Sequence, residues 1–223
     1  MAVLNAFLAK SAYFSGLGEA ENAAVSRFVL EKTAERGEII LFEGEPAEVL
    51  YFVVTGVVKV FKTSAEGKEQ ILELVRPGET FNDVPVFSGQ TNLAGAEALG
   101  PVTLYGIKKS DLEAVFRDYP QFAGNIIKVL SEKVAHLVSL VEDLSFKNVT
   151  GRIAKILLEY GGDGQHPVTR LTQQEMAAIA GTAREMVGRS LKTLETDKAI
   201  RLERHRIVIT DLKLLQGIAG VLA

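Results

Sequence analysis

The pattern of hydrophobic and polar residues divides the chain into three parts, and the first has the character of β-structure. Between about Gly37 and Ile107 the sequence is rich in β-branched and aromatic residues, most densely over Val49 to Lys62. Glycines recur there at spacings of 11 or 12 residues, at Gly44, Gly56, Gly67, Gly78 and Gly89. Turns at this interval are typical of short antiparallel strands. We therefore predict an N-terminal β-roll.

A helical period replaces the strand pattern after the β-roll. Ser110 or Asp111 is placed to cap a short helix, and Pro120 predicts a break before a long helix of about residues 121–146. In the long helix, apolar residues recur at alternating intervals of three and four, as in a heptad repeat. These seam residues are Ile127, Leu130, Val134, Leu137, Val141 and Leu144. The seam, residues 127–144, predicts dimerisation through this helix, and the alternative is a helix packed only on its own β-roll.

The third part has the pattern of a compact module of helices and a short ribbon. A helix opened by Thr150 to Arg152 has an apolar face of Ile153, Ile156, Leu157 and Tyr160. It is predicted to stop at Gly161, with a polar loop over residues 163–167. The following elements are helices over 173–180 and 183–196, strands over 200–202 and 207–209, and a last helix from Asp211. This order predicts a winged helix-turn-helix.

The two middle helices have the residue spacing of a helix-turn-helix. The motif needs a small residue where the helices cross, a turn residue that tolerates positive φ, and a branched apolar residue facing back from the second helix. Ala177, Gly181 and Val187 stand at these offsets. The predicted buried side is completed by Met176, Ile179, Leu191 and Leu194. An ordinary αα-hairpin is the alternative interpretation.

The outward face of the second helix carries residues suited to reading DNA. Arg184, Glu185, Gly188, Arg189 and Lys192 form one stripe at helical spacing. Arginine can donate two hydrogen bonds to guanine, glutamate can accept one from cytosine, and a glycine leaves room for close approach. We predict that phosphate contacts come from Thr172, Gln173, Thr182 and Lys192.

Charge favours a local nucleic-acid surface over a general one. The chain has 223 residues and a formal net charge of −3, which excludes an overall basic coat. Between Arg170 and Arg206 the basic residues exceed the acidic ones by three, so the remainder carries a net charge of −6. The predicted ribbon contributes Arg201, Arg204 and Arg206 to this basic segment.

The composition also excludes several other classes of site. The chain has no cysteine, which excludes disulfides, a thiol nucleophile and a thiolate-held iron–sulfur cluster. No apolar run approaches the roughly 20 residues of a membrane span, and the N-terminus lacks the pattern of a secretory signal, so we expect a cytoplasmic protein without membrane contact. A cupin-like metalloenzyme needs several histidines on its strands, and the strand region has none. We expect no enzyme, with no catalytic or metal-binding residues.

The order of β-roll, long helix and winged helix-turn-helix resembles the cyclic-AMP receptor protein and FNR family of bacterial transcription regulators. The most specific stretches are VTGRIA over Val149 to Ala154 and REMVGR over Arg184 to Arg189, together with Leu50 to Val53 and Gly78 to Phe81 in the β-roll. The resemblance implies an α+β protein with a cyclic-nucleotide-binding-like jelly roll. It implies an effector-sensing domain over 1–147 and a DNA-binding domain over 148–223.

The resemblance also implies how DNA is bound. A homodimer would read a palindromic, TGTGA-like site in double-stranded promoter DNA through Arg184, Glu185 and Arg189, and it would contact RNA polymerase. The FNR branch carries a serine at the position of Gly188, so the receptor-protein type of site is favoured.

The cyclic-nucleotide ligands of the family are replaced in this chain. The phosphate-binding arginine and serine correspond to Leu93 and Ala94, the ribose-binding glutamate to Asp83, and the base-contacting Thr-Ser pair to Leu137 and Val138. No lysine or arginine occurs from Pro77 to Ile107, so a buried phosphate would lack a cation. We therefore expect an effector other than cyclic AMP.

An uncharged or apolar effector is the remaining prediction for the β-roll. The proposed pocket residues are Phe81, Val84, Val86, Phe87, Leu93 and Tyr105, with Asp83, Ala94 and Leu137 beside them. Two alternatives stay open, a regulator that needs no effector and a haem-based gas sensor of the same family. In a haem sensor His136 would be the axial ligand, since His166 and His205 fall in the predicted loop and ribbon.

Overall fold

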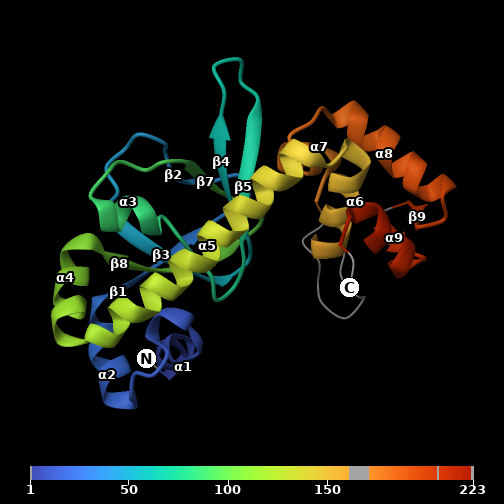
Figure 1. Ribbon diagram of the computed structural model, residues 1–223. Coiled ribbons are helices and arrows are strands. Elements are labelled where there is room, and N and C mark those ends of the chain that lie inside the picture. The colour runs from blue at the N-terminus through green and yellow to red at the C-terminus, as the bar shows by residue number, and fades with distance from the viewer. Residues whose placement is uncertain (1, 161–170, 205, 222–223) are drawn as a thin grey trace. The chain divides into compact units, whose positions relative to one another are not determined.

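The computed structural model describes residues 2–160, 171–204 and 206–221, which form two compact units (Figure 1). The first unit comprises residues 1–62 and 72–136, and the second comprises residues 63–71 and 137–223. The predicted helix stop at Gly161 and the polar loop over 163–167 lie outside the described residues.

The β-roll consists of two four-stranded sheets, as the sequence predicts. One sheet has the order β1-β8-β3-β6, with β1 at Val29–Ala34, β8 at Val102–Lys108, β3 at Val49–Thr55 and β6 at Thr80–Phe81. The other has the order β2-β7-β4-β5, with β2 at Ile39–Leu41, β7 at Gly95–Ala98, β4 at Val58–Thr63 and β5 at Glu69–Val75. The regularly spaced glycines mark turns, because all five have φ between 71° and 94°. At Gly56 a Cβ atom would lie 2.4 Å from the carbonyl oxygen of Pro101, so the turn has no room for a side chain.

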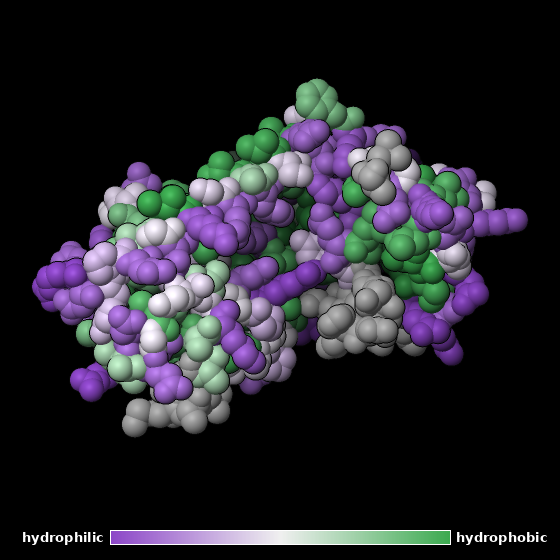
Figure 2. Space-filling model, turned by 60° about the horizontal axis from the view of Figure 1, so that its bottom comes forward, coloured by the Kyte–Doolittle hydropathy of each residue, from purple (hydrophilic) through white to green (hydrophobic). Residues whose placement is uncertain are grey.

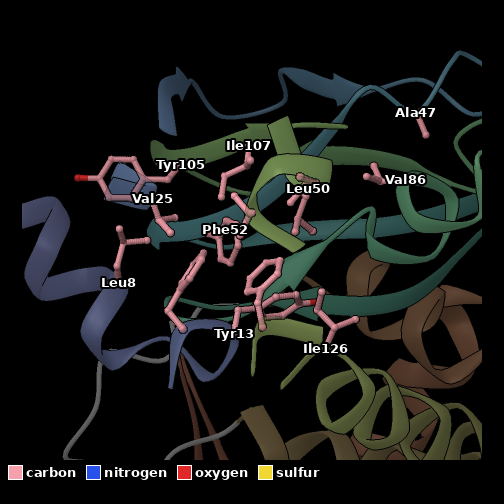
Figure 3. Packing of buried hydrophobic residues seen from close by; sticks show 14 residues of the cluster. Leu8, Tyr13, Val25, Ala47, Leu50, Phe52, Val86, Tyr105, Ile107 and Ile126 are labelled. Carbon is pink, nitrogen blue, oxygen red and sulfur yellow. The ribbon is translucent and has the colours of Figure 1, made fainter. Parts of the chain in front are cut away.

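The main core of the first unit lies against β3 and β8. These strands pair antiparallel with Leu50 opposite Ile107 and Phe52 opposite Tyr105. Residues two apart on a strand face the same side, so Leu50 and Phe52 are buried together (Figure 3). The ring of Tyr13 packs edge-on against Phe52 at a centroid distance of 5.4 Å, which places the N-terminal segment over this face of the sheet.

Helices cover the rest of the first unit. They are α1 at Ala2–Lys10, α2 at Glu19–Val25, α3 at Asp83–Ser88, α4 at Lys109–Asp118 and the first part of α5 at Pro120–Phe146. Short 3₁₀ turns at Ala12–Phe14 and Ser26–Phe28 complete the N-terminal segment. The break before Pro120 is confirmed.

The predicted cap of α4 by Ser110 or Asp111 is wrong. The helix begins directly after β8 with Lys108 at its N-cap, and no side chain caps it. Asp111 lies inside the first turn, where its negative charge is favourable near the positive end of the helix dipole.

The second unit contains the winged helix-turn-helix. Its elements are the end of α5, α6 at Val149–Tyr160, α7 at Gln173–Ala180, α8 at Arg184–Thr196, β9 at Ile200–Glu203, β10 at Arg206–Ile209 and α9 at Leu212–Ala219. Strands β9 and β10 pair antiparallel, and Asp211 caps α9 by accepting a hydrogen bond from the Leu214 backbone N–H at 2.9 Å. The predicted apolar face of α6 is buried in the core of this unit, with Tyr160 partly buried against it.

The predicted seam of α5 leaves large apolar side chains uncovered in the single chain. In the first unit, Ile127 is 67% exposed and Val134 59%, whereas Leu130 is half-buried against the core. In the second unit, Val141 is 63% exposed and Leu137 47%. Among the described residues, no helix is long and apolar enough to span a membrane.

Candidate nucleic-acid interface

The helix-turn-helix begins with a capping box on α7. Thr172 Oγ1 accepts a hydrogen bond from the Glu175 backbone N–H at 3.2 Å, and the Glu175 carboxylate accepts one from the Thr172 backbone N–H at 2.5 Å. This reciprocal pair satisfies two backbone donors that the first turn of a helix leaves free. The cap therefore fixes where α7 starts and where Gln173 stands.

The turn between α7 and α8 depends on Gly181. Its φ is 62°, in the left-handed region, and the Thr182 backbone N–H closes the turn on the Ala177 carbonyl at 3.0 Å. A Cβ atom at position 181 would lie 2.8 Å from Leu144 Cδ2, so this turn packs closely on the end of α5 within the second unit. The small residue at the helix crossing, Ala177, and the branched residue facing back, Val187, are both buried as predicted.

The predicted stripe lies on the outward face of α8. Arg184, Glu185, Arg189 and Lys192 are exposed, and Gly188 is half-buried between them. The side chains of Arg184, Glu185 and Lys192 have no hydrogen-bond or ion-pair partner within the described part of the chain. Arg189 Nη1 lies 3.8 Å from Met186 Sδ, a weak contact within the same helix. The helix therefore presents two guanidinium groups and a carboxylate that are available to an external partner.

Three of the four residues predicted to contact phosphates lie around the starts of α7 and α8, and the fourth, Lys192, lies further along α8. Thr172 and Gln173 are exposed and Thr182 is half-buried. Gln173 Oε1 lies 3.9 Å from the position that a Cβ of Gly188 would occupy, so the start of α7 borders the middle of the stripe. The structure thus brings the two predicted groups of DNA-binding residues onto one surface of the second unit.

The wing, which is the ribbon of β9 and β10, carries less unpaired positive charge than its sequence predicts. Arg201 Nη2 lies 2.8 Å and Arg206 Nε 2.5 Å from the carboxylate of Glu203. Hydrogen bonds from Arg206 and Arg201 hold the pKa of the half-buried Glu203 carboxyl below its usual value. Arg204 is exposed. In Figure 2, hydrophilic residues spread over much of the visible face, with hydrophobic residues gathered in smaller groups between them.

The residues predicted to line an effector pocket are divided in the structure. Val86 and Tyr105 are buried in one core cluster with Phe87 packed against it, whereas Phe81 is buried in another and stacks on Tyr51 at 5.2 Å. Of the others, Val84 and Leu93 are 48% and 47% exposed, Ala94 is half-buried, and Leu137 is an exposed seam residue of the second unit.

Asp83 belongs to a buried polar cluster that the sequence did not reveal. Its side chain is 3% exposed and accepts hydrogen bonds from the Tyr13 hydroxyl and from Thr80 Oγ1, the latter at 2.7 Å. Lys133 of α5 lies 3.0 Å from its other oxygen, 3.4 Å from the Glu73 carboxylate, and donates to the Thr80 carbonyl at 2.5 Å. We name these five residues the Asp83 cluster. It joins the N-terminal segment, both sheets and α5 within the first unit.

The Asp83 cluster perturbs the titration of Tyr13, Glu73 and Lys133. Burial raises the pKa of the Tyr13 hydroxyl, and the Asp83 carboxylate beside it raises it further. Burial also raises the pKa of Glu73, although Lys133 opposes the shift. For Lys133, burial alone would lower the pKa, but the carboxylates of Asp83 and Glu73 outweigh it and raise the pKa. Lys133 is therefore a charged ammonium committed to partners within the chain.

The remaining predicted ligand, His136, is exposed on α5. Over residues 2–160, 171–204 and 206–221, no group of three or more histidine, aspartate or glutamate side chains is arranged to hold a metal ion. His166 and His205 lie outside the described residues.

Comparison with known proteins gives two family models that together cover most of the chain. A cyclic nucleotide-binding domain matches residues 31–119, and a Crp-like helix-turn-helix domain matches residues 151–218. The cyclic AMP receptor protein of Thermus thermophilus is 30% identical over 213 residues, 96% of this chain and 99% of that relative. The cAMP-activated global transcriptional regulator CRP of Salmonella typhimurium is 33% identical over 76% of this chain and 84% of its own.

Solved structures show the same architecture. FixK2 from Bradyrhizobium japonicum is 26% identical, with a TM-score of 0.76 over 87% of this chain and 99% of that one. The matches run through both the β-roll and the helix-turn-helix.

Proposed function

Because the chain belongs to the cyclic-AMP receptor protein and FNR family of transcription regulators and carries their helix-turn-helix DNA-binding domain, we propose that it acts as a homodimer on palindromic promoter DNA. In the proposed domain organisation, residues 1–147 sense the effector and residues 148–223 bind DNA. The observation that carries the proposal is the exposed stripe on α8, where Arg184, Glu185 and Arg189 stand on one face of a helix whose opposite face is buried.

The stripe supports a TGTGA-like half-site. A guanidinium can donate two hydrogen bonds to guanine O6 and N7, and a carboxylate can accept one from cytosine N4, so Arg184, Arg189 and Glu185 suit the two G·C pairs of this half-site. Lys192, Thr172 and Gln173 flank these residues and suit phosphate oxygens, which position the helix without reading sequence.

The exposed seam of α5 supports the homodimer. Contiguous apolar residues on the surface of a monomer are a mark of an interaction site, and here they follow a heptad repeat. A symmetric pair of α5 helices would cover Ile127, Val134 and Val141 in both copies and would present two recognition helices to successive major grooves, about 34 Å apart. The resemblance to this family further implies RNA polymerase as a partner beyond DNA.

The β-roll residues do not fit a cyclic nucleotide. The family positions for the phosphate hold Leu93 and Ala94, and the described cation nearest the ribose position, Lys133, is already bound by Asp83 and Glu73. The Asp83 carboxylate already accepts hydrogen bonds from the Tyr13 hydroxyl and Thr80 Oγ1. The cluster has two carboxylates for one ammonium, so a phosphate placed there would meet excess negative charge. Titration calorimetry with cyclic AMP at about 1 mM is expected to give no binding heat, and micromolar binding would overturn this assignment.

We infer that the effector is uncharged or apolar, or that DNA binding needs none. The exposed side chains of Val84, in α3, and of Leu93, shortly before β7, support an apolar ligand. The self-contained Asp83 cluster supports the effector-free version, because α5 is held on the roll without a ligand. A haem sensor with His136 as ligand is the third version, and the absence of a Soret band after incubation with haem would exclude it. No enzymatic activity is proposed.

Fluorescence anisotropy with synthetic duplexes tests the DNA-binding assignment. Arg189→Ala is expected to cost about 1–3 kcal/mol on a TGTGA-like palindrome and to relax preference at one base pair. Lys192→Ala is expected to weaken binding to all sequences alike and to reduce the salt slope by about one. If Arg189→Ala keeps the full sequence preference, the base-reading role of the stripe is wrong.

A further inference from the structure

A compact ionic cluster joins the end of α5 to α6. Asp143 of α5 is 8% exposed and contacts Lys147 Nζ at 2.9 Å, one turn further along the helix. Its other oxygen contacts Lys155 of α6, which also donates to Ser139 Oγ at 3.0 Å. We name these four residues the α5–α6 latch, and all of them lie in the second unit.

The short link between the two helices is held at the same place by hydrogen bonds to its backbone. Arg152 donates to the Lys147 carbonyl at 2.6 Å and to the Ala180 carbonyl at 2.8 Å. The Gly151 backbone N–H donates to Asn148 Oδ1 at 2.8 Å, which caps the start of α6. The junction thus has directional contacts from side chains of both helices and of the link, and Arg152 connects it to the last residue of α7.

The latch lies between the two surfaces that a dimer would use. On one side are the exposed seam residues Leu137 and Val141, which would contact the partner copy. On the other side is α6, which packs on α8 in one core through Ile153 and Val187. All of these residues belong to one compact unit, so the angle between α5 and α6 fixes where the stripe of α8 stands relative to Leu137 and Val141.

We propose that the α5–α6 latch sets the half-site spacing that the dimer accepts, with Asp143 as its central positioning residue. The proposal rests on the function proposed above. In a two-fold dimer, any tilt of α6 against α5 occurs in both copies and changes the separation of the recognition helices twice over. Neighbouring base pairs are about 3.4 Å apart, so a tilt that moves each stripe by a few ångströms shifts the preferred spacing by a whole base pair.

Of the residues in the α5–α6 latch, Asp143 is the one whose replacement is expected to disturb the junction most, because it carries the negative charge between two lysines. Burial alone would raise the pKa of its carboxyl, but hydrogen bonds from Lys155 and Lys147 outweigh this and lower it, so the carboxylate stays charged. With a neutral residue at position 143, Lys147 would lose the carboxylate that it contacts, and Lys155 would keep only the more distant carboxylate of Glu159, at 3.8 Å, so the two ammonium groups would repel each other more strongly across the junction. The helices would then be pushed apart, although neither the seam nor the stripe is altered.

The test measures affinity against spacing. Wild type, Asp143→Asn and Lys155→Gln are titrated by anisotropy against inverted TGTGA repeats whose centres are moved in single base pairs around about 10 base pairs, and against a duplex with one half-site. Wild type is expected to prefer one spacing by about tenfold over its neighbours. In both variants the preference is expected to fall to about threefold or less, with single half-site affinity within about twofold of wild type. Asp118→Asn, which removes an exposed ion pair with Arg117 in the first unit, serves as the control and is expected to behave as wild type.

The outcomes separate this proposal from the function on which it rests. If wild type binds neither the single half-site nor any palindrome, the proposed function itself is wrong. If wild type binds palindromes without a preferred spacing, or if the variants keep the wild-type preference, the latch proposal is wrong while the function stands. Lys155→Gln removes the positive charge that Asp143 contacts on α6. If Asp143→Asn does not fold, the spacing preference of Lys155→Gln therefore tests the latch proposal.

Discussion

Replacement of Lys133 by methionine is expected to destabilise the first unit strongly. The lysine side chain is 20% exposed, and its ammonium lies 3.0 Å from Asp83 and 3.4 Å from Glu73. Methionine keeps much of the apolar stem but leaves both carboxylates without a counter-charge, and the Asp83 side chain is only 3% exposed. Removing one partner of a buried ion pair costs about 3–5 kcal/mol, and the partial exposure of Lys133 places the expected loss near about 3 kcal/mol.

Urea unfolding followed by tyrosine fluorescence measures this loss. The chain has five tyrosines and no tryptophan, and Tyr13, Tyr51, Tyr105 and Tyr119 all belong to the first unit. With a urea dependence of about 2–3 kcal/mol per molar, a loss of 3 kcal/mol lowers the midpoint by about 1 M or more.

An exposed ion pair of the same unit gives the control. Arg117 and Asp118 are 76% and 53% exposed, so Arg117→Met is expected to cost less than about 1 kcal/mol. If Lys133→Met unfolds at the same urea concentration as this control, the Asp83 cluster does not hold α5 on the β-roll, and the reasoning from its charges fails.

Three further changes test other parts of the structure. Gly181→Ala is expected to cost about 1–3 kcal/mol, because φ is 62° and the new Cβ would meet Leu144 Cδ2 at 2.8 Å; an unchanged calorimetric melting temperature would contradict this. Val141→Glu places a charge in the exposed seam and is expected to give a monomer by light scattering, whereas a persistent dimer would refute the seam. Glu73→Gln should stabilise the first unit at pH 7. The pKa of the Glu73 carboxyl is raised in the folded state, so this group contributes stability only below its ordinary pKa, and the contribution is lost as pH rises through the pKa of the folded state. Its advantage over wild type in urea should therefore vanish below about pH 4.5, and an advantage that grows on acidification would reverse the assignment.

The architecture was predictable because it depends on local patterns. The glycine series marks turns whatever the partner strands are, and Gly181 follows from the backbone geometry that a helix-turn-helix needs. The stripe of Arg184 to Lys192 followed from helical spacing alone. These signals lie within stretches of chain short enough for periodicity to identify them.

The polar clusters could not be predicted in the same way, because their members are distant in sequence. Tyr13 and Asp83 are 70 residues apart, and Lys133 lies 53 residues from the Thr80 carbonyl that it binds. No role is predicted for Lys133, and Asp83 is predicted as the counterpart of a family ligand that lies beside the effector pocket. The available signal was an isolated acidic residue within the apolar run from Phe81 to Phe87, which a buried position would oblige to find a partner.

The division of the chain within α5 also affects how parts of this protein can be exchanged with those of relatives. A hybrid protein joined between residues 147 and 148 would take Lys155 from one parent and Asp143 from the other. The ion pair between α5 and α6 would then be formed by residues from two different parents. A hybrid cut between His136 and Leu137 would transfer the last turns of α5, the junction and the recognition helix as one inherited block. Swapped regulators built at the second boundary should retain the operator geometry of the parent that donated the C-terminal block.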